Sequence, residues 1–146
     1  DLIKRDDEQQ CGTTMQDVLG SAQGNWFDGK GQSYKLENQQ KSLSLIHDNI
    51  DPEVGVMVGG GIMGSDLQTR FSPKHSGRIN REFSEIKPGD EVYCYQADSF
   101  GGAPILEQQN TSVLVRLVSA TELQVERVSP SCDNTLKLKN PHTFIR

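Results

Sequence analysis

From Gly24 onward, apolar residues recur at every second position in a series of short runs. The alternation is present in residues 42–45, 54–58, 113–117, 123–126 and 136–139. A period of two is typical of β-strands that have one buried face and one solvated face. Turn-forming pairs separate the runs, among them Asp28-Gly29, Asp51-Pro52 and Pro88-Gly89. The pattern predicts an all-β fold, either an antiparallel barrel or a barrel-like sandwich of about eight strands.

The first 23 residues follow a different pattern. Met15, Val18 and Leu19 are spaced as on one face of a helix, and Gly20 ends the run. We therefore expect a polar lead and a short N-terminal helical segment over residues 1–23. A single β-barrel-like domain is expected over residues 24–146, because a chain of 146 residues has the size of one domain.

Composition and charge argue against two classes of partner. The chain has 15 Lys and Arg residues against 20 Asp and Glu residues, a formal net charge of -5. A surface that binds duplex nucleic acid needs a cationic excess, so no nucleic-acid partner is expected. No apolar run reaches the length of about 20 residues that a membrane-spanning helix needs, so no membrane span is expected.

The chain has three cysteines, Cys11, Cys94 and Cys132, so at most one disulfide can form within it. The sequence begins at Asp1 without a leader, which we interpret either as cleavage after export or as a trimmed chain. Export predicts a secreted or periplasmic location, where disulfides persist. Cys11 and Cys132 stand in polar loop contexts and are the expected pair, with Cys94–Cys132 as the alternative. No Cys-x-x-Cys pair is present, so neither a metal site of the zinc type nor a cofactor is predicted.

Residues 59–64 match the Gly-x-Gly-x-x-Gly fingerprint of dinucleotide-binding loops. The mechanism of that motif requires a helix directly after it, with its N-terminus facing a pyrophosphate. Pro73 and Gly77 leave no room for such a helix. The glycines are therefore expected to form a hairpin or a bulge.

Residues 47–51 gather an imidazole, an amide and two carboxylates. Oxygen donors of this kind can hold Ca²⁺, but the ligand series of a calcium-binding loop is missing. Asp and Asn also favour turns by accepting hydrogen bonds from their own backbone. The sequence leaves open whether His47, Asp48 and Asp51 bind an ion or form a turn.

Residues for catalysis are present but not in a recognisable arrangement. No Gly-x-Ser-x-Gly elbow occurs, and no motif joins a nucleophile, a base and an orienting group. A non-catalytic function is therefore favoured, and the question of an enzyme stays open. The basic residues Lys74, Arg78 and Arg81 would suit an anionic ligand, but charge on an edge strand explains them equally well.

Residues 23–27 read Gln-Gly-Asn-Trp-Phe, and Trp26 is the one tryptophan of the chain. This segment resembles the Gly-x-Trp signature of the lipocalins and their calycin relatives. The resemblance implies an eight-stranded up-and-down barrel, preceded by a short helical segment, with Trp26 closing one end. It also implies an arginine near the C-terminus that packs on the tryptophan, a part that Arg146 or Arg127 would play.

These observations lead to a functional hypothesis. We expect a non-catalytic, exported β-barrel-like domain whose partner is a small apolar or amphipathic ligand, with an oligomeric state that the sequence leaves open. The ligand-binding residues are expected on the inward faces of the strands: Val56, Val113, Val115, Leu117 and Val125. Structural roles are assigned to Trp26, Cys11 and Cys132. The alternative is a filled-core accessory or protein-interaction module of the cell envelope or of a larger assembly.

Overall fold

A computed structural model describes residues 16–28, 42–59, 67–98, 112–128, 132 and 136–146. The described residues form eight strands and one short 3-10 helix. The strands are β1 (Gly24–Asp28), β2 (Ser42–His47), β3 (Gly55–Gly59), β4 (Leu67–Phe71), β5 (Tyr93–Tyr95), β6 (Ser112–Ser119), β7 (Glu122–Val128) and β8 (His142–Ile145), and the helix is η1 (Phe83–Glu85).

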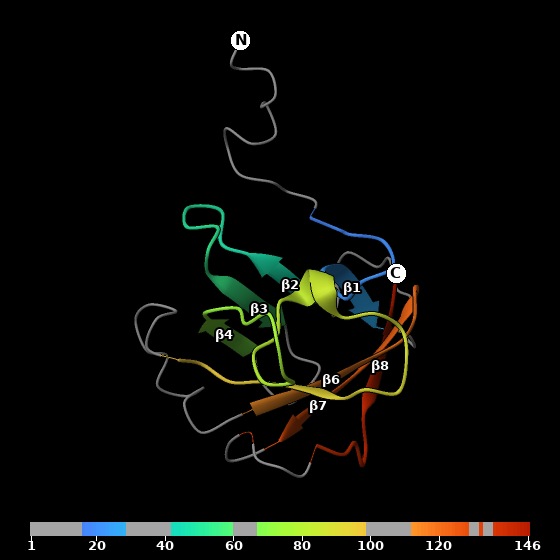
Figure 1. Cartoon of the computed structure of the whole chain (residues 1–146). Helices are drawn as coiled ribbons and strands as arrows, with labels where there is room; N and C mark the ends of the chain where they lie inside the picture. The colour runs from blue at the N-terminus through green and yellow to red at the C-terminus, as the bar shows by residue number, and fades with distance from the viewer. Residues whose placement is uncertain (1–15, 29–41, 60–66, 99–111, 129–131, 133–135) are drawn as a thin grey trace.

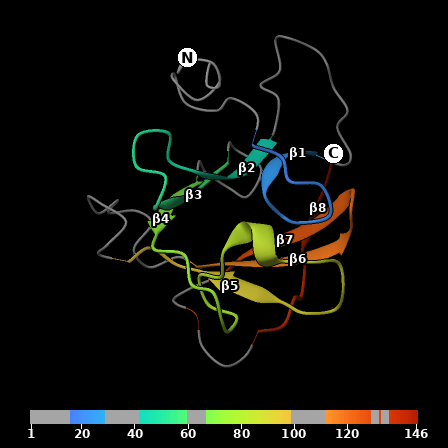
Figure 2. The same ribbon diagram turned by 45° about the horizontal axis from the view of Figure 1, so that its top comes forward.

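All eight strands belong to one antiparallel sheet with the order β4-β3-β2-β1-β8-β7-β6-β5. The sheet curls into a nearly closed barrel (Figure 1 and Figure 2). Its two edge strands approach each other, since the ring centroids of Phe71 on β4 and Tyr95 on β5 lie 5.2 Å apart. The backbone N–H of Asp98 donates to the carbonyl of Arg70 at 3.3 Å and links the same two edges. The all-β, antiparallel, eight-stranded prediction is confirmed.

The predicted N-terminal helical segment is wrong for the residues that the structure describes. Residues 16–23 form an irregular segment with a turn at residues 19–20, and Gly20 has a φ of 82°. The side chain of Gln16 pairs with the backbone of His47, donating to its carbonyl at 3.0 Å and accepting from its N–H at 2.9 Å. The segment is therefore held at the end of β2 by these hydrogen bonds and does not form a helix. Met15 lies outside the described residues.

The interior of the barrel is packed with apolar side chains. Register places Leu45 opposite Met57 and Trp26 opposite Leu43, and all four are fully buried. The predicted inward residues of β6 and β7 belong to the same core cluster: Val113, Val115, Leu117 and Val125.

Val56 does not share this inward face. It pairs with Ile46 and Arg70, on the opposite side of the sheet from Met57. Because successive strand residues point to opposite faces, the inward position falls to Met57. The expectation that Val56 points into the barrel is therefore wrong.

The disulfide joins Cys94 to Cys132, so the preferred Cys11–Cys132 pairing is wrong and its alternative holds. Cys94 is fully buried on β5. The side chain of Gln96 accepts the backbone N–H of Cys132 at 3.1 Å and holds that residue beside β5. The bond ties an edge strand to the connection between β7 and β8. Cys11 lies outside the described residues.

The glycine-rich motif lies between two neighbouring antiparallel strands. Gly59 at the end of β3 pairs with Leu67 at the start of β4, so the motif belongs to a hairpin connection. This arrangement is not the strand–helix unit of a dinucleotide site. Residues 60–66 themselves lie outside the described part. Among the described residues, no helix has the length and apolarity to cross a membrane.

Candidate functional site: the two ends of the barrel

The meander gives the barrel two chemically different ends. One end carries residues 16–23, the β2–β3 turn, the long connection between β4 and β5, and the β6–β7 turn. We call it the plugged end, because η1 within the β4–β5 connection brings Phe83 into the core. The opposite end, which we call the far end, is where β1, β3, β5 and β7 finish.

Trp26 and Arg146 meet at the plugged end. The Trp26 side chain is fully buried, and its indole N–H donates to the carbonyl of Ala22 at 2.9 Å. The guanidinium carbon of Arg146 lies 4.2 Å from the centroid of the Trp26 ring, within the range of a cation–π contact. The guanidinium also donates to the backbone carbonyls of Gln23 (2.9 Å), Ser21 (2.6 Å), Ala120 (3.2 Å) and Val18 (3.4 Å). The resemblance implied that either Arg146 or Arg127 packs on the tryptophan, and in the structure Arg146 does so.

Gly24 makes this contact sterically feasible. Its φ of 138° lies in a region that side-chain-bearing residues rarely adopt. A Cβ atom there would overlap the carboxylate of Asp17 and lie 2.8 Å from Nη1 of Arg146. The same Asp17 carboxylate accepts the backbone N–H of Asn25 at 2.8 Å. The Gly-x-Trp step thus leaves space for two charged side chains above the buried indole.

The β4–β5 connection closes the barrel with an aromatic cluster. The ring of Phe83 lies 5.3 Å from that of Phe71 and 5.0 Å from that of Tyr95. The Tyr95 hydroxyl donates to the carbonyl of Arg81 at 2.7 Å. Burial raises the pKa of Tyr95 well above its ordinary value, so the phenol stays neutral. Ile86, also fully buried, completes the apolar contact.

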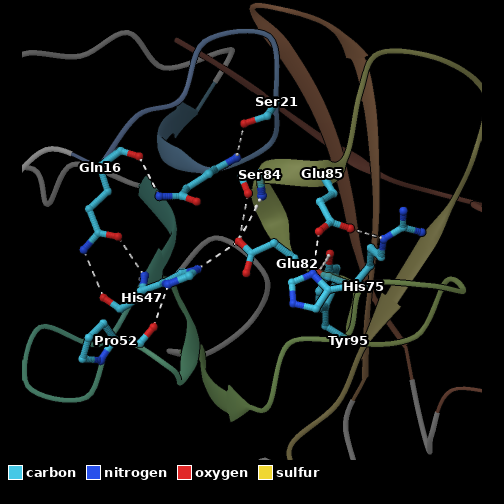
Figure 3. A network of polar contacts seen from close by, with 11 residues as sticks. Gln16, Ser21, His47, Pro52, His75, Glu82, Ser84, Glu85 and Tyr95 are labelled. Carbon is cyan, nitrogen blue, oxygen red and sulfur yellow. Dashed lines mark hydrogen bonds and ion pairs between the residues drawn. The ribbon is translucent and has the colours of Figure 1, made fainter.

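His47 and Glu82 connect that segment to the β2–β3 hairpin (Figure 3). His47 Nε2 lies 2.9 Å from Glu82 Oε2, and His47 Nδ1 lies 2.8 Å from the carbonyl oxygen of Pro52. The hydrogen bond to Glu82 raises the pKa of His47 above its ordinary value, although burial opposes this. Burial would raise the pKa of Glu82, but hydrogen bonds from His47 and Ser84 outweigh it and lower that pKa.

This arrangement does not form a nucleophile and base pair. The Ser84 hydroxyl contacts the Glu82 carboxylate at 3.2 Å, while both ring nitrogens of His47 face other acceptors. Activation of a serine needs a free imidazole nitrogen that accepts its proton. The geometry is that of a structural ion pair between two segments.

A second histidine–glutamate pair lies on the surface nearby. Glu85 accepts from His75 Nδ1 at 2.5 Å and from Arg81 Nε at 2.8 Å, and 73% of the His75 side chain is exposed. Arg81 and His75 lower the pKa of Glu85. Arg78 pairs with Glu91 at 3.3 Å. Arg78 and Arg81 are therefore each paired with a carboxylate within the chain, and with Lys74 they lie in the β4–β5 connection, not on an edge strand.

The residues considered for an ion form a turn. Asp48 Oδ1 accepts the backbone N–H groups of Ile50 (2.7 Å) and Asp51 (3.2 Å), and Oδ2 accepts from Arg70 at 2.6 Å. The Ile50 N–H and the Arg70 guanidinium lower the pKa of Asp48. Within the described ranges, no three His, Cys, Asp or Glu residues are grouped closely enough to hold a metal ion.

Two polar residues stand at inward register positions, Thr69 in the middle of β4 and Arg127 near the end of β7. Thr69 pairs with the core residue Met57, is 1% exposed, and its hydroxyl makes no hydrogen bond with any residue that the structure describes. Arg127 pairs with Val113 and therefore shares the inward face.

The inward position of Thr69 and the pairing of Glu82 were not predicted from the sequence, for different reasons. Thr69 stands between Leu67 and Phe71 at strand spacing, so a period of two in this segment would have placed it inward. Glu82 and His47 are 35 residues apart, and no local pattern joins them.

Comparison with protein-family models, with curated proteins and with solved structures gives no match to this chain. The fold and the two ends define a class by geometry: a nearly closed antiparallel barrel, plugged at one end, with a buried tryptophan under an arginine.

Proposed function

We propose that this chain is an exported barrel that binds a small amphipathic molecule inside the far half of its interior. The observation that carries the proposal is the inward hydroxyl of Thr69, which is 1% exposed and has no hydrogen-bond partner among the described residues. A buried hydroxyl without a partner costs about 1–3 kcal/mol, and native proteins usually satisfy such a group with water or a ligand.

The chemistry of the wall suggests how the ligand lies. The polar group of the ligand accepts or donates a hydrogen bond at Thr69. The apolar part contacts core residues of β6 and β7, among them Val113 and Val125. Val115 and Leu117 lie further along β6 toward the plugged end and form the deeper part of the same surface. Val56, on the outer face, has no part in it.

Two features support a lipocalin-like, exported protein. Arg146 stacks on Trp26 beside Gly24, the combination that the resemblance to the lipocalins implies. The Cys94–Cys132 disulfide favours an oxidising compartment, because disulfides rarely persist in the cytosol.

A second candidate function, a filled-core interaction module, is favoured by the packing of the interior. The largest fully buried side chains are aromatic residues from four strands and from η1: Trp26, Tyr95, Phe71, Phe144 and Phe83. On the outer face, Phe27 and Ile145 are cross-strand neighbours with 41% and 44% exposure. Under this alternative the barrel is a scaffold and its outer surface contacts a protein.

The two functions are separated by ligand-retention and binding measurements. Native mass spectrometry of protein purified from its source should show a retained small molecule, and a fluorescent anilinonaphthalene sulfonate probe should bind saturably and compete with it. Thr69→Val keeps the side-chain shape and removes the hydroxyl, so it should weaken retention of the natural ligand about tenfold. Thr143→Val on the outer face of β8 is the matched control and should change nothing. Absence of both a retained molecule and saturable probe binding would favour the filled-core module.

A further inference from the structure

The β4–β5 connection is attached to the two halves of the barrel very unequally. We call residues 74–91 of this connection the plug. On the side of β5 and β6 the plug makes a series of backbone and side-chain hydrogen bonds. They run from Asn80 N–H to Cys94 O (2.8 Å), Cys94 N–H to Arg78 O (2.8 Å), Gly89 N–H to Leu117 O (2.9 Å), Tyr95 Oη to Arg81 O (2.7 Å) and Arg116 Nε to Gly89 O (3.0 Å).

On the side of the β2–β3 hairpin, the described polar connection is the ion pair of His47 and Glu82. Glu82 stands at the N-terminus of η1, and its carboxylate also accepts the backbone N–H of Ser84 at 3.2 Å. The position of Glu82 therefore fixes the helix that carries Phe83 into the core. His47 is fixed in turn by Gln16, which pairs with its backbone.

The hydrogen-bond inventory of His47 determines its protonation state in the closed arrangement. Nδ1 faces the carbonyl oxygen of Pro52 and Nε2 faces the carboxylate of Glu82, and neither partner atom has a proton to donate when Glu82 is ionised. A neutral imidazole has one N–H and can satisfy one of these acceptors, whereas an imidazolium satisfies both. We propose that the His47–Glu82 pair is a proton-operated latch, which holds the plug against the β2–β3 hairpin while His47 is charged and loosens it when His47 loses its proton.

The other charged groups around the pair are already matched to partners of their own. In the hairpin, Asp48 pairs with Arg70 at 2.6 Å. In the plug, Glu85 pairs with Arg81 and His75. Tyr95 on β5 stays neutral because it is buried. Asp17, in the N-terminal segment, accepts a backbone N–H from Asn25. The remaining acidic residues of the hairpin turn are exposed: Asp51 and Glu53.

The sign of the pH dependence follows from the two partners. The raised pKa of His47 gives a stabilisation that is complete below its ordinary value of 6.5 and is lost as the pH rises through the folded-state pKa. The lowered pKa of Glu82 gives a stabilisation that is complete above its ordinary value of 4.5 and is lost as the pH falls through its folded-state pKa. The latch is therefore tightest between pH 4.5 and pH 6.5.

Amide hydrogen exchange measured by NMR tests the latch. The reporting amides are those of Glu82, which donates to Lys74 O, and Ile86, which donates to Phe83 O. Their protection factors, corrected for the intrinsic pH dependence of exchange, should fall roughly threefold to tenfold between pH 5.5 and pH 8, the range for a half-buried charged pair. The amide of Val115, in the middle of β6 and flanked by β5 and β7, should keep its protection. In His47→Gln the pH dependence of the plug amides should disappear.

The matched control is His75→Gln, which removes the other histidine–glutamate pair of the plug and should preserve the wild-type pH dependence. Should His47→Gln fail to fold, Glu82→Gln provides the second variant, and it too should abolish the dependence. The latch is overturned if wild-type protection does not change with pH, if the dependence survives in both latch variants, or if it is lost in His75→Gln.

Discussion

Removing the Arg146 side chain should destabilise the barrel by about 3 kcal/mol. Its stacking on Trp26 contributes about 0.5–2 kcal/mol, depending on how far the guanidinium is desolvated. The two short hydrogen bonds, to Ser21 O at 2.6 Å and Gln23 O at 2.9 Å, contribute about 1 kcal/mol each, since the half-buried carbonyls regain some water after truncation. A domain has only about 5–15 kcal/mol in total, so Arg146→Ala removes a substantial share.

The assay is thermal unfolding followed by far-UV circular dichroism, for Arg146→Ala and Arg146→Lys beside the wild type. A loss of about 3 kcal/mol should lower Tm by roughly 10 °C in a chain of this length. Lysine keeps the charge but lacks the planar fork, so it should recover less than half of the loss. A Tm for Arg146→Ala within about 2 °C of wild type would refute the role of the stack and the carbonyl contacts. A lysine variant as stable as wild type would refute the requirement for the fork.

Three further predictions concern the same end of the barrel and the disulfide. Gly24→Ala should destabilise by about 2 kcal/mol or more, because its φ is 138° and the new methyl group overlaps Asp17; a denaturant midpoint equal to that of wild type would contradict this. Trp26→Ala should cost about 3–5 kcal/mol or prevent folding, and the native indole should emit at short wavelength; emission like that of indole in water would argue against its burial. Peptide mapping without reductant should link Cys94 to Cys132, and a linked peptide that contains Cys11 would overturn the pairing. Cys132→Ser should lower the free energy of unfolding by about 4 kcal/mol, because the disulfide closes a loop with a separation of 38 residues.

Four of the five alternating runs lie in strands, namely β2, β3, β6 and β7. The run at residues 136–139 forms no strand, and β8 lies at His142–Ile145 instead. The N-terminal segment could not be predicted. A strand is indicated by a local alternation of apolar residues with a turn on either side, and both signals come from residues that are close in the sequence. Met15, Val18 and Leu19 have helical spacing, but a short helix needs an apolar face that packs. In the structure Leu19 is 82% exposed and Val18 is 38% exposed, so that packing surface does not exist. The backbone of this segment is held instead by Gln16 and Arg146, whose partners lie far away in the sequence.

The disulfide and the latch depend on contacts across the barrel. The polar neighbours of Cys132 indicated a position outside the strands, which the structure confirms, but its partner is determined by the approach of the β7–β8 connection to β5. His47 stood out in the sequence as part of a polar cluster. Its partner Glu82 comes from a segment that folds back over the barrel, so the pairing appears only once the sheet is closed.

The inward face of β3 shows why a period of two identifies a strand but not always its buried side. Residues 54–58 contain two alternating sets, the three valines and the pair Gly55 and Met57. Both sets are apolar or small, and the valines are the more hydrophobic set. Val54 and Val56 are also buried, but the set that points inward is the other one, since Gly55 faces the ring of Phe71 and Met57 pairs with Leu45. A Cβ atom on Gly55 would lie 2.6 Å from Cζ of Phe71, so this position has to be glycine for the ring to fit. A glycine inside a strand therefore marks a place where the core accepts a large side chain from a neighbouring strand. The pairing of Gly55 with Phe71 therefore indicates the inward face of β3, whereas the hydrophobicity of Val56 indicates the wrong face.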